Sequence, residues 1–224
     1  MANGSISEEH PGKSHGSTWT GTFGRACGWL LDIIVYGLSL TRISPNVLTF
    51  FGLVINIGAA FFFGHADATN AGRMFFYGGL VIIGAGLFDM VDGRVARRTN
   101  QVTVFGAFFD SVMDRYSDVV LFFGLLVYYA RSNHLRYVVL TAFVMITSLM
   151  VSYTRARAEA LIGQCKVGFM ERPERIVLII LGALFQWANV MAPVLWVLAI
   201  LSTITVIHRI QFTYEATKNL PAQE

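Results

Sequence analysis

The sequence predicts an all-α integral membrane protein in which six transmembrane helices follow an amphipathic helix at the membrane surface. Its 224 residues are 54% hydrophobic and only 14% charged, whereas soluble domains average roughly 25% charged residues. The mean hydropathy is +0.56. The apolar residues come in long blocks, as expected of helices that cross the hydrocarbon core of a bilayer. Together these observations exclude soluble globular, collagen-like and disordered chains.

The first two segments are predicted to lie outside the hydrocarbon. Residues 1–22 are rich in Gly, Ser, His and Thr, and we expect a disordered cytoplasmic tail. The apolar block 23–40 carries Arg25, Asp32 and Ser39 at seven-residue intervals, on one stripe of a helix. This stripe favours an interfacial helix. The alternative, a true span with Asp32 in mid-membrane, is disfavoured by the cost of burying its charge.

Six apolar blocks follow a predicted turn and helix start at Ser44-Pro45-Asn46. The predicted spans are 47–64, 74–91, 104–130, 135–153, 176–190 and 192–208, with loops at 65–73, 92–103, 131–134 and 154–175 and a very short turn at 188–191 before Pro193. A membrane catalytic domain would then cover residues 23–213 and a cytoplasmic tail residues 214–224. Most Lys and Arg residues fall on one side of this layout, and only Arg73, Arg131 and Arg136 fall opposite. The basic side is therefore predicted to be cytoplasmic, in a multi-pass protein of the cell membrane.

Five aspartates gather at the cytoplasmic ends of spans two and three. Asp89 and Asp92 are spaced i, i+3 at the end of span two, and Asp110, Asp114 and Asp118 are spaced i, i+4 and i+8 at the start of span three. Each set projects from one helical face. Because consecutive helices joined by a short loop are usually neighbours, the two acidic faces are expected to converge.

Such a cluster needs neutralisation, since close carboxylates repel strongly in a low dielectric. Carboxylates without His or Cys suit Mg²⁺ or Mn²⁺, and two such ions form the usual clamp for phosphoryl transfer. Gly93 leaves room for a phosphate or nucleotide, and Arg97 and Arg98 supply cations for phosphates. The alternatives are an ion-conducting helix pair and carboxylates that merely cap two helix ends.

The motif made by these residues resembles the complete signature of the CDP-alcohol phosphotransferases, also called CDP-alcohol phosphatidyltransferases. The matching positions, with the spacing of the signature, are Asp89, Asp92-Gly93, Ala96-Arg97, Gly106, Asp110 and Asp114. The resemblance implies that an alcohol hydroxyl attacks the phosphate of a CDP-linked lipid and that CMP leaves. It also implies a homodimer, and no nucleic-acid partner is expected.

The resemblance further implies a role for each residue of the motif. Asp89, Asp92 and Asp110 would bind two metal ions, and Asp114 would contact a metal and act as general base. The nucleotide would be bordered by Asp92, Gly93, Ala96 and Arg97. Asp118 lies outside the signature, and the sequence leaves open whether it is an outer residue of the site or a partner of Arg115.

Basic segments beside the motif resemble the branch that makes phosphatidylinositol phosphate or its archaeal counterpart. By this resemblance the phosphate of the acceptor would be held by Arg155, Arg157, Arg172 and Arg209. Positions i and i+2 do not share a helix face, so only one of Arg155 and Arg157 is expected to point into the site. Arginine suits a phosphomonoester, which favours a phosphorylated polyol such as inositol phosphate.

Three alternatives remain open at this point. Glycerol 3-phosphate is the main rival acceptor, because the phosphatidylglycerophosphate synthases share the signature. A cation-coupled membrane carrier would use the same aspartates as a relay, and its mark would be flux across a sealed vesicle without any nucleotide. Intramembrane aspartyl proteolysis needs only two aspartates and explains neither Gly93 nor Arg97.

Overall fold

The computed structural model describes residues 44–98 and 102–218, and of Asp92, Gly93, Val95, Ala96 and Arg98 it describes the backbone alone. The predicted tail 1–22, the predicted interfacial helix 23–40 and the last six residues lie outside the described residues. Within the described part, every regular element is helical. The elements are α2 (Pro45–His65), α3 (Ala71–Arg98), α4 (Val104–Arg131), α5 (Leu135–Ile162), α6 (Arg172–Leu184), the short 3-10 helix η1 (Gln186–Ala188) and α7 (Met191–Thr217).

The six predicted helices are confirmed, and four of them are long and apolar enough to cross a membrane. These are Pro45–His65, the Ala71–Val91 part of α3, Leu135–Ile162 and Met191–Thr217. Helix α4 differs because its first half carries Asp110, Asp114, Arg115 and Asp118. Helix α6 has only 13 residues, or about 20 Å of helix at 1.5 Å per residue, which is less than the roughly 30 Å hydrocarbon core.

Several predicted boundaries are wrong, including the end of α7, which continues to Thr217 instead of ending at residue 208. Helix α3 continues to Arg98 and α5 to Ile162, so these helices extend into the predicted loops 92–103 and 154–175, and α6 already begins at Arg172. The residue that follows α5, Gly163, has a φ of 78°, a conformation that favours glycine and ends the helix. The predicted span 176–190 is interrupted, because α6 ends at Leu184 and Asn189 adopts a left-handed conformation.

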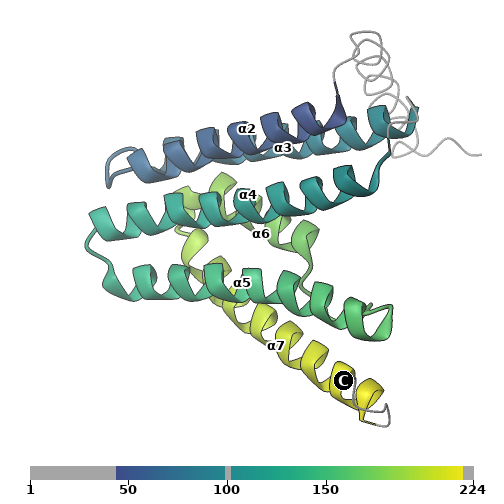
Figure 1. Cartoon of the computed structure of the whole chain (residues 1–224). Coiled ribbons are helices and arrows are strands. Elements are labelled where there is room, and N and C mark those ends of the chain that lie inside the picture. The colour runs from purple at the N-terminus through teal and green to yellow at the C-terminus, as the bar shows by residue number, and fades with distance from the viewer. Residues whose placement is uncertain (1–43, 99–101, 219–224) are drawn as a thin grey trace, which may run out of the picture.

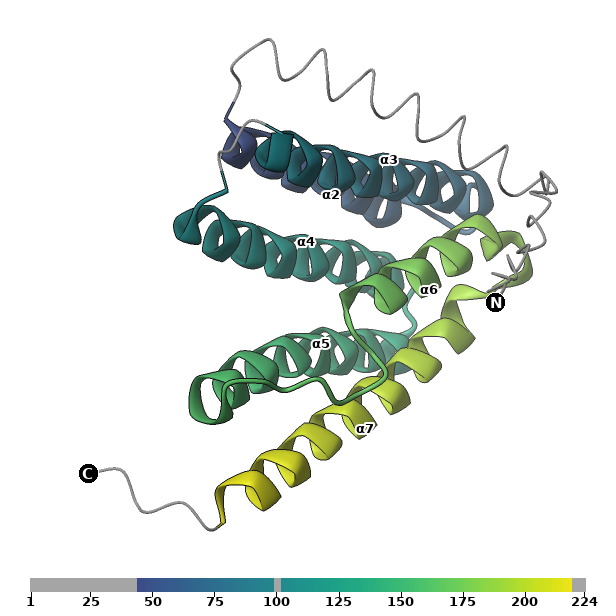
Figure 2. The same cartoon turned by 90° about the vertical axis from the view of Figure 1, so that its right-hand side faces the viewer.

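The helices form layers that bring the motif residues to one end of the molecule. Helix α2 packs on α3 and α4, while α5 packs on α4 and α7, and α7 crosses obliquely beneath them (Figure 1). Figure 2 shows α6 between α3 and α7, both of which it contacts. A Cβ atom added to Gly124 would lie 2.5 Å from the carbonyl oxygen of Ala60. This glycine therefore allows α4 to approach α2 closely, near the buried Phe63 and Leu125.

Local hydrogen bonds fix the starts of two helices that carry the candidate site. The Thr103 hydroxyl accepts a hydrogen bond from the Gly106 amide at the start of α4. Glu171 and Glu174 form a capping box at the start of α6. At the other end of the helices, the Asp67 carboxylate accepts hydrogen bonds from Thr69 and Asn70, and these bonds lower the pKa of Asp67.

Candidate active site

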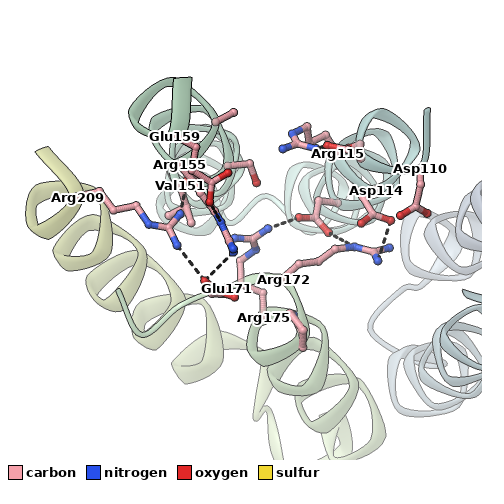
Figure 3. Close-up of a pocket in the computed structure, with 15 residues that line it drawn as sticks. Asp110, Asp114, Arg115, Val151, Arg155, Glu159, Glu171, Arg172, Arg175 and Arg209 are labelled. Carbon is pink, nitrogen blue, oxygen red and sulfur yellow. Dashed lines mark hydrogen bonds and ion pairs between the residues drawn. The ribbon is translucent and has the colours of Figure 1, made fainter. Parts of the chain in front are cut away.

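A cavity of about 430 Å³ opens between α4, α5, the start of α6 and α7. Figure 3 shows its acidic wall on α4 and basic side chains on the opposite side. Its charged lining residues are Asp110, Asp114, Arg115, Asp118, Arg155, Glu159, Glu171, Arg172, Arg175 and Arg209. The fold thus brings most of the residues of the two predicted clusters, acidic and basic, into one pocket.

Arg172 joins two carboxylates of the predicted metal site. Its Nη1 atom lies 3.1 Å from Asp89 Oδ2 on α3 and 2.8 Å from Asp114 Oδ1 on α4. The Arg172 side chain is 26% exposed, so this cation still borders the cavity. A residue predicted to hold the acceptor phosphate therefore touches the residue predicted to act as general base.

Asp118 lies one turn after Asp114 on α4 and contacts two arginines of α6, Arg172 and Arg175. Its Oδ2 atom accepts a hydrogen bond of 2.5 Å from Arg175 Nη2, and its Oδ1 atom lies 3.8 Å from Arg172 Nε. The pairing with Arg115, which the sequence left open, does not form, because Arg115 turns back to the carbonyl and hydroxyl oxygens of Ser111. Asp118 is thus an outer residue of the site.

Glu171 links the two remaining arginines that line the cavity. Arg155 donates to Glu171 Oε1 at 2.8 Å and to Glu159 at 3.0 Å. Arg209 donates to Glu171 Oε1 at 3.2 Å and to the carbonyl oxygens of Val167 and Val151 at 2.9 and 2.6 Å. The Arg209 side chain is only 1% exposed, so its position is fixed by these bonds.

Arg157 does not line this cavity. It borders a separate cavity of about 240 Å³ between α5 and α7, together with Tyr153, Leu161 and Tyr214. Arg209 borders both cavities. Because α5 remains helical through this segment, Arg155 and Arg157 lie on different faces, and of the two only Arg155 lines the cavity that contains the acidic wall.

The predicted metal ligands fit a divalent cation in their chemistry. Among the described residues, which omit the Asp92 side chain, no three His, Cys, Asp or Glu residues are close enough to hold one ion. Asp89 and Asp114 nevertheless flank a single positive charge, that of Arg172, and hard carboxylate oxygens suit Mg²⁺ or Mn²⁺. Of Asp92, Gly93 and Ala96 only the backbone is described, while the Arg97 side chain is exposed.

Two features of the site were missed in the sequence. Arg175 lines the cavity, and its i, i+3 spacing from Arg172 could have placed both on one face of α6. Gly52 on α2 faces Asp89, and a Cβ atom there would lie 2.8 Å from Asp89 Oδ1. No sequence pattern pointed to Gly52, because its role depends on the packing of α2 against α3.

The chain is similar to known proteins over most of its length. A family model for CDP-alcohol phosphatidyltransferase matches residues 42–207. The archaetidylinositol phosphate synthase of Pyrococcus horikoshii is 39% identical over 192 residues, which are 85% of this chain and 92% of that protein. The phosphatidylinositol phosphate synthase of Mycobacterium tuberculosis is 35% identical over 186 residues, which are 79% of this chain and 82% of that protein.

Crystal structures of the Mycobacterium tuberculosis enzyme share the fold. The complex with manganese and citrate has a TM-score of 0.78 and 32% identity, and it covers 87% of this chain and 93% of that one. The complex with CDP-DAG has a TM-score of 0.76 and 31% identity, over 87% and 98% of the two chains. The described fold is thus that of a multi-pass membrane protein.

Proposed function

The chain belongs to the CDP-alcohol phosphatidyltransferase family, and from that premise we propose that it transfers a phosphatidyl group from CDP-diacylglycerol to inositol phosphate and releases CMP. The proposal makes it an enzyme of phospholipid synthesis that works as a homodimer, with its active site facing the cytoplasm. The excess of Lys and Arg on one side of the spans supports that orientation.

The observation that carries the proposal is the contact of Arg172 with Asp114. It supports an acceptor whose phosphate meets arginines while its hydroxyl meets a carboxylate. Arg155, Arg172, Arg175 and Arg209 line the cavity, and guanidinium groups bind phosphate in bidentate fashion. Relatives at 35–39% identity are named as synthases of inositol phosphate lipids.

In the proposed reaction Asp114 takes the proton of the attacking inositol hydroxyl. The hydroxyl oxygen then bonds to the phosphorus that carries the lipid, and the bond from this phosphorus to CMP breaks. Asp89, Asp92, Asp110 and Asp114 would hold two divalent ions, which neutralise the pyrophosphate and the departing CMP when bound. Gly93, Ala96 and Arg97 would border the nucleotide with Asp92, and we assign Arg157 to a lipid headgroup phosphate at the membrane surface.

The test is CMP release by the purified protein with CDP-diacylglycerol and Mg²⁺ or Mn²⁺, against inositol phosphate, free inositol, glycerol 3-phosphate and serine in parallel. We expect release with inositol phosphate and loss of release on chelation of the metal. Preference for glycerol 3-phosphate would keep the mechanism and overturn the acceptor. Cation flux into sealed vesicles without nucleotide, and no CMP with any acceptor, would instead indicate the carrier.

A further inference from the structure

Four side chains of alternating charge connect α4 to α6, and we call them the charge ladder: Asp114, Arg172, Asp118 and Arg175. Asp114 Oδ1 lies 2.8 Å from Arg172 Nη1, Asp118 Oδ1 lies 3.8 Å from Arg172 Nε, and Asp118 Oδ2 lies 2.5 Å from Arg175 Nη2. The aspartates are spaced i, i+4 on α4 and the arginines i, i+3 on α6, so each pair shares a helical face. All four border the cavity.

The inner half of the charge ladder is buried. The side chain of Asp118 is 5% exposed and that of Arg175 is 1% exposed. A buried arginine without a counter-ion is strongly destabilising, and Asp118 is the only carboxylate within ion-pair distance of Arg175 among the described residues. Helix α6 packs mainly against α3 and α7 rather than against α4. These charges therefore reach across the space between α4 and α6.

Several polar atoms in the inner half of the charge ladder have no hydrogen-bond partner. Within the described part of the chain, Arg175 Nε and Nη1, Arg172 Nε and Asp118 Oδ1 are buried and make no hydrogen bond. The 3.8 Å separation of Asp118 Oδ1 from Arg172 Nε is too long for a direct bond. Buried donors without partners are costly in a folded protein. Asp118 thus holds one edge of Arg175 and leaves other donors of both arginines for an anion.

We propose that Asp118 is a positioning residue for the acceptor phosphate, an inference that rests on the proposed function. Its carboxylate fixes Arg175 at the inner wall of the cavity and keeps Arg172 between two acidic neighbours, Asp114 and Asp118. Without it, Arg172 is left to the carboxylates of Asp89 and Asp114, and Arg175 loses its fixed orientation. The geometry of the two guanidinium groups, more than their charge, then determines how well the phosphate binds.

The Asp118→Asn variant distinguishes a positioning role from a purely electrostatic one, because the two roles predict opposite changes in the KM for inositol phosphate. Removal of a negative charge near the phosphate would lower the KM for inositol phosphate if charge alone mattered. A positioning role predicts the opposite, a KM for inositol phosphate raised roughly tenfold, as for a lost charge-assisted hydrogen bond. The KM for CDP-diacylglycerol should change less than about twofold, since Asp118 lies outside the motif. An unchanged or lowered KM for inositol phosphate would overturn the inference.

Arg131→Gln is the matched control, because it removes another partly buried arginine contact at the far end of the helices. Arg131 Nη1 donates to the carbonyl oxygen of Gly64 at 2.7 Å. Both variants are expected to lower the thermal unfolding temperature, but only Asp118→Asn should raise the KM for inositol phosphate. An equal rise of this KM in both variants would show that Asp118 acts only by stabilising the fold.

Two further measurements keep the test decisive. Asp118→Glu retains the charge but moves the carboxylate by one methylene group, so it tests position if Asp118→Asn does not fold. We expect its KM for inositol phosphate to rise, and an unchanged KM would overturn the inference. In the Arg175→Lys background, Asp118→Asn should raise this KM by much less than in the wild type; a full, independent rise would show that Asp118 does not act through Arg175. If the wild-type protein releases no CMP with inositol phosphate, the proposed function itself has failed.

Discussion

Arg172 on α6 lies 2.8 Å from the Asp114 carboxylate on α4, so a candidate phosphate-binding cation and the candidate general base are in direct contact. The same guanidinium reaches Asp89 on α3 at 3.1 Å. One residue thus connects the acidic motif to the basic pocket. This contact explains how an acceptor bound through its phosphate would present a hydroxyl to Asp114.

Asp114→Asn tests the role of the base. A positioned general base contributes about 10²- to 10⁴-fold to a reaction rate, and Asn cannot accept the proton. We therefore expect CMP release to fall by at least about a hundredfold while the protein remains folded. Asp67→Asn, which alters an exposed carboxylate at the opposite end of the helices, should stay within about twofold of wild type. Activity above a tenth of wild type in Asp114→Asn would contradict the assignment.

Gly52→Ala tests the space beside Asp89. The added Cβ atom would lie 2.8 Å from Asp89 Oδ1, so the carboxylate has to move. We expect Mn²⁺, measured by isothermal titration, to bind several-fold more weakly. Gly58→Ala lies on the same helix, where nothing is within 4 Å of the added atom, and should bind Mn²⁺ as the wild type does. Equal affinities in the two variants would show that Gly52 has no part in placing Asp89.

Arg155→Ala and Arg157→Ala form a matched pair. Arg155 lines the cavity beside the acidic wall, whereas Arg157 lines the neighbouring cavity. Loss of a charge-assisted contact costs about 1.5–3 kcal/mol, so Arg155→Ala should raise the KM for inositol phosphate by tenfold or more. Arg157→Ala should leave this KM within about threefold. Reversed effects would place the acceptor phosphate in the other cavity.

Gly124→Ala tests the packing that holds the motif helices together. The new methyl group would meet the Ala60 backbone at 2.5 Å, and overpacking of this kind costs about 1–3 kcal/mol. We expect a lower unfolding temperature in detergent. Gly84→Ala, with nothing within 4 Å, should not be destabilised. If the two variants unfold at the same temperature, the close approach of α4 to α2 does not occur.

Hydropathy located the helices well because it measures the lipid-facing residues that each of them needs. It placed the ends of α3 and α5 too early, since both helices continue through polar residues to Arg98 and Ile162. Polar side chains end the contact with lipid but not the helix. The apolar run at 176–190 likewise placed the break too late: the sequence predicted a turn at 188–191, whereas α6 ends at Leu184 and η1 and the left-handed Asn189 follow.

The candidate site was predictable where its residues share a motif and not where they meet only through packing. The spacing of Asp89, Asp110 and Asp114 is visible in the sequence. The pairing of Asp118 with Arg175 is not, because it depends on how α4 and α6 approach each other. The sequence left open whether Asp118 pairs with Arg115, and the fold shows that Arg115 turns back to Ser111 instead.

The proposed acceptor is tested most simply by comparing the kcat/KM of the wild-type protein for inositol phosphate and for free inositol, with CDP-diacylglycerol as donor. The lipid product is identified by mass spectrometry. We predict a preference for inositol phosphate of at least about a hundredfold, because arginines that line the cavity would lose their phosphate partner with free inositol. The product should retain the phosphate of the acceptor. Equal use of free inositol, or a product without that phosphate, would contradict the assignment of the arginine-lined cavity to a phosphorylated acceptor.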